Sequence, residues 1–179
     1  KKNTLAVRLE NLPESSRWYP GAGLYRNVHV IVTENAHIPV WGTYVTTPTA
    51  TKEFAKVNVR TQIVLLEGAD AGKYSVKTSV WNPNGQKLTE QTIPLSQIKY
   101  NDNSLSQEFI IQTPTLWSPD MPALYSAETR LYEGDQLKDI YTTPFGIRSI
   151  EIIPNKGFFL NGEKTVFKGV CNHHDLGPL

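Results

Sequence analysis

Apolar and polar residues alternate with a period of two in several stretches of the chain. In Val57–Leu65 the odd positions are apolar or β-branched, and the even positions up to Gln62 are polar. Tyr74–Val80 and Tyr125–Leu131 follow the same pattern. Successive side chains of a strand point to opposite faces, so each stretch is predicted to form a strand with one buried face.

Turn residues separate these strands. Asn and Gly tolerate the positive φ that tight hairpins need. The clearest turn signals are Asn82–Gly85, Gly134-Asp135 and Asn161-Gly162. Prolines between residues 113 and 123 exclude a regular helix there, and no stretch of the chain has a convincing helical period. Many short strands joined by turns predict an all-β fold, an immunoglobulin-like β-sandwich.

The pattern divides the chain into three parts. They are residues 1–34, residues 35–147 and residues 148–179. The middle part holds about seven strand candidates, the number expected for an immunoglobulin-like sandwich. The outer parts hold strand-like runs at Leu5–Leu9, Asn27–Thr33 and Val166–Val170. Because strands need partners for their backbone groups, these outer runs suggest a fragment of a larger multidomain protein.

Composition and charge exclude several classes of function. The chain is 39% hydrophobic and 20% charged, as globular domains are. Its net charge of +1 gives no strong field to attract nucleic acid or an anionic membrane. No apolar run reaches the roughly 18 residues of a membrane span, and no signal peptide is visible. The lone Cys171 cannot form an internal disulfide, so cysteine content does not indicate the compartment.

Two loops are rich in aromatic residues. The segment Arg17–Arg26 combines three aromatic side chains with proline and glycine. Its aromatic faces suit stacking on sugars, and its arginines suit hydroxyl groups, while a packed corner of the fold explains the same composition. The segment Leu116–Tyr125 is predicted to be structural, because its prolines fix a path that places Trp117 as a plug at one end of the sandwich.

The polar C-terminal segment contains Cys171, His173, His174 and Asp175. Adjacent histidines on an extended chain point in opposite directions, so they do not readily share a metal ion. No third group is placed to orient a Cys–His pair. A polar turn that faces a ligand and a solvated tail remain the two interpretations. Sugar hydrolysis needs two carboxylates about 5–9.5 Å apart in a pocket, and the acidic residues lie on predicted outward faces or turns. We therefore predict no catalytic pair.

Three ordered motifs resemble glycoside hydrolase family 2, and within it the β-galactosidases. They are Arg17–Val28, then Leu116–Tyr125 with Phe145–Arg148, then Gly157–Glu163 with Phe167–Val170 and His173–Asp175. The resemblance implies that residues 1–34 end an N-terminal sugar-binding jelly roll. It implies that residues 35–147 form the immunoglobulin-like second domain and that residues 148–179 begin a (β/α)8 catalytic barrel. β-Glucuronidases and β-mannosidases share this layout and remain alternatives.

The resemblance also implies an activity for the parent protein. Such enzymes are retaining exo-glycosidases, here for terminal β-galactosides, and both catalytic glutamates lie deeper in the barrel. The chain alone is expected to be inactive, with no catalytic residue, no metal site and no cofactor. His173 matches a histidine that lines the sugar pocket in relatives. Arg17 stands where relatives often carry an acidic residue that contacts the sugar. These two residues are the candidates for substrate binding.

Further expectations concern the setting of the parent enzyme. Relatives that scavenge sugars suggest a periplasmic or secreted location, and a homo-oligomer is one alternative for the parent. A free-standing carbohydrate-binding module and a cell-surface adhesion sandwich are the competing functions. No nucleic-acid partner and no membrane span are expected.

Overall fold

The structure is a computed structural model that describes residues 2–10, 12, 23–24, 27–97 and 104–171. The chain divides into two compact units, residues 1–32 and residues 33–179. The described residues up to Glu34 form no strand or helix. The strands predicted at Leu5–Leu9 and Asn27–Thr33 are therefore wrong, because alternation alone supplies no partner strand for their backbone groups.

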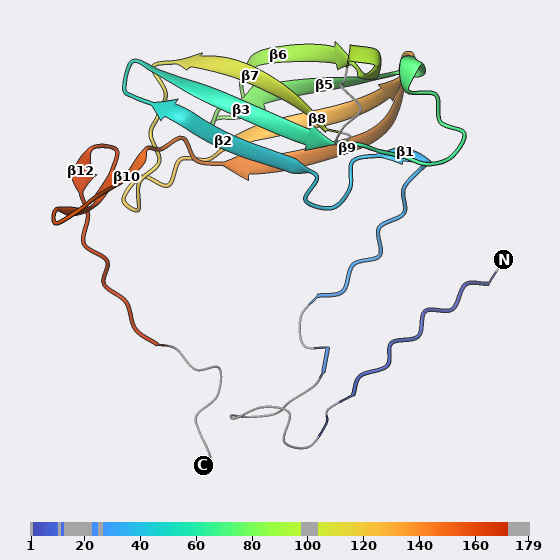
Figure 1. Cartoon of the computed structure of the whole chain (residues 1–179), viewed down its shortest axis with the longest axis horizontal. Coiled ribbons are helices and arrows are strands. Elements are labelled where there is room, and N and C mark those ends of the chain that lie inside the picture. Colours follow the sequence, from blue (N-terminus) through green and yellow to red (C-terminus); the bar gives the residue numbers. More distant parts are fainter. Residues whose placement is uncertain (1, 11, 13–22, 25–26, 98–103, 172–179) are drawn as a thin grey trace. The chain divides into compact units, whose positions relative to one another are not determined.

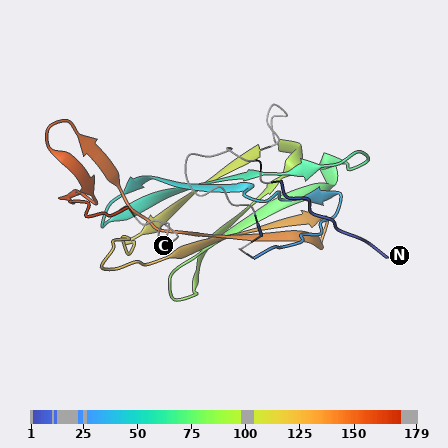
Figure 2. The same ribbon diagram turned by 90° about the horizontal axis from the view of Figure 1, so that it is seen from below.

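Two antiparallel sheets form the sandwich of the second unit (Figure 1). The first sheet has the order β2 (Thr43–Ala50), β3 (Phe54–Gln62), β7 (Ser104–Gln112). The second has the order β6 (Lys87–Pro94), β5 (Tyr74–Trp81), β8 (Tyr125–Glu133), β9 (Gln136–Phe145). Figure 2 shows these strands stacked in two layers. The predicted all-β sandwich is confirmed.

Shorter elements flank the sheets. β1 (Ala36–His37) pairs with β4 (Val64–Leu65), and single 3₁₀ turns form at Ala71–Lys73 and Leu95–Gln97. β10 (Ile150–Ile153), β11 (Gly157–Leu160) and β12 (Glu163–Lys164) form a small third sheet. Within the described ranges no helix is long and apolar enough to cross a membrane.

The C-terminal hairpin is partly as predicted. Asn161-Gly162 forms its turn, with both residues at positive φ, as the sequence suggests. The strand expected at Val166–Val170 is wrong, because the ladder ends at Lys164 and the following apolar side chains are exposed. An apolar run without a partner strand has no ladder to join.

The alternating residues of the inner strands form the core. The positions of β3 that face inward, Ala55, Val57 and Val59, are fully buried, and β5 and β8 show the same alternation. The buried residues form two apolar clusters. One contains Phe109 and Tyr125, and the other contains Leu105 and Leu131.

A layer of buried polar side chains lies between the two clusters along the strands. Strands β3, β5, β7 and β8 each contribute one residue to it: Thr61, Thr78, Gln107 and Thr129. Thr78 Oγ1 donates to Gln107 Oε1 at 2.6 Å, and Gln107 Nε2 donates to the Gln91 carbonyl at 2.9 Å. A register shift would leave Thr78 and Gln107 unpaired in an apolar interior, so these two residues favour a single pairing of the sheets.

Candidate functional site

The two candidate substrate-binding residues, Arg17 and His173, lie outside the described residues. The same holds for His174 and Asp175. Cys171 is described and is exposed as a free thiol. The described part of the chain contains no group of three His, Cys, Asp or Glu side chains that could hold a metal ion. Among the described residues, the side chains that make the most specific contacts lie at the end of the sandwich, around Trp117, and form a structural site.

Trp117 joins the proline-rich loop to the end of β9. Its backbone N–H donates to the Ile147 carbonyl at 2.8 Å. Its side chain packs so closely on Gly146 that a Cβ there would lie 2.7 Å from Trp117 Cγ. The sequence predicts that Trp117 plugs the end of the sandwich. In the structure, the neighbouring Leu116 packs against the apolar cluster, and Trp117 lies half-buried over Gly146. Glycine at position 146 thus lets the indole lie against the backbone.

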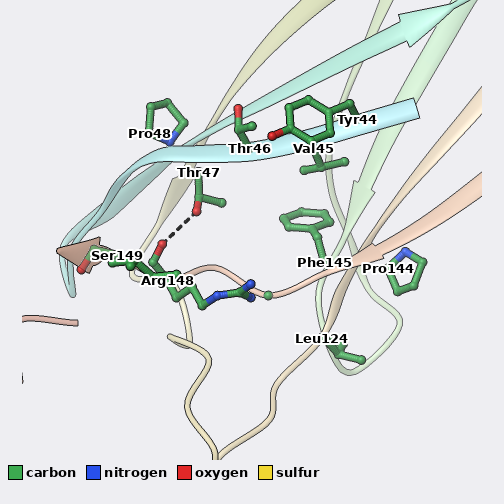
Figure 3. Close-up of a pocket in the computed structure, with 12 residues that line it drawn as sticks. Tyr44, Val45, Thr46, Thr47, Pro48, Leu124, Pro144, Phe145, Arg148 and Ser149 are labelled. Atoms are coloured by element: carbon green, nitrogen blue, oxygen red, sulfur yellow. Dashed lines mark hydrogen bonds between the residues drawn. The ribbon is translucent and has the colours of Figure 1, made fainter. Parts of the chain in front are cut away.

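Arg148 also contacts Trp117. Its guanidinium carbon lies 5.0 Å from the centroid of the Trp117 ring, within range of a cation–π interaction. Its backbone carbonyl accepts a hydrogen bond of 2.9 Å from Thr47 Oγ1 on the edge strand β2, drawn in Figure 3. Arg148 therefore connects the loop at Trp117 to the edges of both sheets.

Asn161 ties the C-terminal hairpin to this point. Its backbone has φ of 52°, a left-handed conformation that asparagine tolerates better than most residues. Its N–H donates to the Ser149 carbonyl and its Oδ1 accepts from the Ser149 N–H, each at 3.0 Å. Its Nδ2 donates to the Trp117 carbonyl at 3.0 Å. We call Trp117, Gly146, Arg148 and Asn161 the joint, because together they fasten the hairpin to the sandwich.

A hollow of about 760 Å³ lies beside the joint. It opens between the edge strand β2 and the segment from Pro144 to Ile150 (Figure 3). Val45 and Phe145 point toward one another in it, and among the described residues that line it only Arg148 is charged. With no carboxylate among its lining residues, this hollow can bind a group but lacks the pair that sugar hydrolysis requires.

Carboxylates elsewhere in the described residues are solvated or paired. Asp120 and Glu163 line one hollow beside the proline-rich loop, and both are exposed, so neither is desolvated as a general acid would be. Hydrogen bonds from Lys87 and Lys77 lower the pKa of Glu90 to about 2. Glu90 is therefore ionised at neutral pH and cannot donate a proton to a leaving group.

Comparison with known proteins identifies the family of the chain. Residues 36–148 match the family described as "Glycosyl hydrolases family 2". The chain belongs to glycosyl hydrolase family 2. This membership confirms the resemblance on which the sequence interpretation relied.

Relatives in this family are much longer than the chain. It is 38% identical to β-galactosidase BoGH2A of Bacteroides ovatus, over 99% of this chain and 21% of the relative. It is 29% identical to a β-glucuronidase of Bacteroides fragilis, over 100% of this chain and 27% of the relative. The chain therefore spans about a fifth to a quarter of the length of these two relatives.

Solved structures of the family share the fold. A family 2 member from Bacteroides cellulosilyticus superposes with a TM-score of 0.82 at 34% identity, over 93% of this chain and 23% of that one. A β-glycosidase from Bacteroides vulgatus gives a TM-score of 0.74 at 32% identity, over 88% of this chain and 19% of that one. The chain corresponds to a partial region of such a family 2 enzyme.

Sequence reasoning found the elements of the joint but missed how they meet. Trp117 and the Asn161-Gly162 turn were each recognised, as a structural plug and as a hairpin signal. The contact between Trp117 and Gly146 and the bond from Asn161 were not predicted. The sequence signal for this contact is the Phe-Gly-x-Arg run at the end of a strand, because a glycine there lets another side chain pack against the backbone.

Proposed function

We propose that this chain is the non-catalytic β-sandwich of a retaining exo-glycosidase that hydrolyses terminal β-galactosides. Its task is to hold the neighbouring domains of that enzyme in place. The observation that carries the proposal is the joint, in which four residues fix the hairpin after β9 to the end of the sandwich through side-chain and backbone contacts. In this proposal, residues 148–179 lead into the catalytic barrel and residues 1–34 come from the jelly roll.

Rigid placement matters for the chemistry of such an enzyme. A misplacement of about 1 Å far from the reacting atoms can cost about 100-fold in rate. The joint uses short hydrogen bonds, a close-packed glycine and a cation–π contact, all of which tolerate little movement. A sandwich fastened in this way is suited to keep a barrel at a fixed distance from its other domains.

The galactoside specificity rests on the relatives. The 38% identity to a protein named as a β-galactosidase supports it, and a Formosa agariphila relative named as a putative β-glucuronidase, at 34%, is the competing model. Within this proposal Arg17 and His173 contact the substrate. A periplasmic or secreted location is proposed with it, since sugars are scavenged there.

Kinetics of the whole enzyme that carries this chain test the placement role. Trp117→Ala and Asn161→Ala are compared with Leu137→Ala, a change of an exposed side chain on β9. With nitrophenyl β-galactoside, we expect both joint variants to lose about tenfold or more in kcat/KM at temperatures where they are folded. The control is expected to match the wild type. Joint variants with wild-type kinetics would contradict the placement role.

The substrate is tested in the same enzyme. We expect nitrophenyl β-galactoside to be a better substrate than nitrophenyl β-glucuronide by kcat/KM. His173→Ala is expected to raise KM, while His29→Ala, a histidine of the described exposed segment, serves as its control. A preference for the glucuronide would replace the galactosidase assignment and leave the placement role standing.

A further inference from the structure

A strained turn holds a tryptophan in solvent at the start of β2. The Gly42 N–H donates to the Pro39 carbonyl at 2.8 Å, which closes a four-residue turn. Trp41, the third residue of this turn, has φ of 62°. Glycine or asparagine normally occupies such a position, and a bulky residue there is an outlier. The indole gains no burial in return, since Trp41 is 86% exposed.

Surrounding contacts fix this turn in place. The Trp41 N–H donates to the Tyr141 hydroxyl at 3.1 Å. The Gly42 carbonyl accepts a hydrogen bond of 2.7 Å from the Gln62 N–H, and a Cβ on Gly42 would lie 2.7 Å from the Pro39 carbonyl oxygen. A strained backbone conformation persists only where surrounding contacts hold it in place, and strained residues are concentrated at functional sites. An exposed side chain on such a fixed turn is positioned for contact with a partner.

A small hollow lies beside the indole. It has a volume of about 190 Å³. The hollow is lined by Trp41, Gly42, Tyr44, Arg60 and Gln62. Tyr44 and Arg60 are directly paired across β2 and β3, so their side chains lie on the same face. Arg60 Nε donates to Ser104 Oγ at 3.1 Å, which orients the guanidinium.

We propose that Trp41, Tyr44, Arg60 and Gln62 form a binding surface for a pyranose saccharide. Flat aromatic faces stack on the C–H face of a sugar ring, and Tyr44 is 66% exposed beside the indole. The guanidinium donates to hydroxyl groups in a fixed plane, and the Gln62 amide both donates and accepts. Two aromatic groups and two planar polar groups around one small hollow match the amphipathic surface of a sugar.

The polar lining of the hollow favours a sugar over a protein partner. The centre of a stable protein contact is mostly apolar and depleted of charged residues. Here a hollow of about 190 Å³ has Arg60 and Gln62 on its wall. The inference goes beyond the proposed function, because it concerns binding by the sandwich and involves no hydrolysis.

Titration of the complete 179-residue chain with methyl β-galactoside, methyl β-glucoside and lactose tests the proposal. Binding is followed by calorimetry and by NMR of the indole N–H. Trp41→Gly is the decisive variant, because glycine adopts positive φ without strain, so the turn is preserved while the indole is removed. Leu137→Ala, an exposed change on the other sheet, is the matched control.

We expect millimolar, saturable binding of at least one of the sugars by the wild type and the control. Trp41→Gly is expected to weaken it by about tenfold or more, while circular dichroism shows an unchanged fold. A wild-type chain that binds none of these sugars overturns the proposal. Binding that Trp41→Gly leaves unchanged also overturns it. Neither result affects the hydrolysis kinetics that test the proposed function.

Discussion

Replacing Gly146 with alanine tests whether the joint is packed as tightly as the structure indicates. The added Cβ would lie 2.7 Å from Trp117 Cγ, 2.8 Å from its Cβ and 2.9 Å from its Cδ1. Favourable contacts between carbon atoms lie at about 3.5–4.0 Å, so the indole must move. These atoms are near the base of the side chain, and the Trp117 backbone is bonded at both its N–H and its carbonyl.

The magnitude follows from this geometry. Inserting a methyl group into a well-packed contact costs about 1–3 kcal/mol. For a chain of this length each kcal/mol lowers Tm by about 2–4 °C, so we expect Gly146→Ala to lower Tm by roughly 2–12 °C. Gly169→Ala is the control: its Cβ meets no atom within 4 Å and its φ is not positive, so its effect should stay within about 0.5 kcal/mol.

A double-mutant cycle separates the contact from other effects. Free energies of unfolding are measured by urea denaturation for Gly146→Ala, Trp117→Ala and the double variant. Trp117→Ala removes the ring atoms at 2.7 and 2.9 Å but keeps the Cβ at 2.8 Å, so Gly146→Ala should cost clearly less in this background than in the wild type. An equal cost in both backgrounds, or no cost in the wild type, would show that the indole does not lie against Gly146.

Three further predictions concern stability. Gln107→Leu should cost about 1–3 kcal/mol in urea denaturation, because it leaves the buried Thr78 hydroxyl without its acceptor, and adding Thr78→Val should recover much of the loss. Asn161→Gly keeps the positive φ but loses the side-chain bonds, so it should destabilise by about 1–3 kcal/mol, and a neutral result would contradict the role of the amide. The pKa of Glu90 is lowered from 4.5 to about 2, so its ion pairs stabilise the fold above pH 4.5 and lose this effect as the pH falls toward 2. Glu90→Gln should therefore reduce the fall in Tm across that interval by a small amount, and an unchanged fall would contradict it.

The fold was predictable because its signal is local. The alternation in β3 places Val57 and Val59 on one face, and both are fully buried. The alternation in β7 turns Gln107 to the same face as Leu105 and Phe109, but its partner, a hydroxyl of the other sheet, was not predictable from the local pattern. Val166–Val170 has the composition of a strand, but pairing requires a neighbour that composition cannot supply.

The candidate site was predictable only in its parts. Trp117 was correctly placed in a structural loop, whereas its contact with Gly146 depends on how the loop returns to the end of β9. The exposure and positive φ of Trp41 are invisible in sequence, where Val40–Gly42 resembles an ordinary strand start. Arg17 and His173 remain predictions, since both lie outside the described residues.

The most direct measurement of the central claim is an assay of the purified 179-residue chain with nitrophenyl β-galactoside, with the whole enzyme as the positive control. A sandwich without a catalytic pair should release nitrophenol no faster than buffer, while circular dichroism and urea denaturation show it to be folded. Saturable hydrolysis that copurifies with the chain and is abolished by Asp120→Asn or Glu163→Gln, the described carboxylates that share a hollow, would contradict the account.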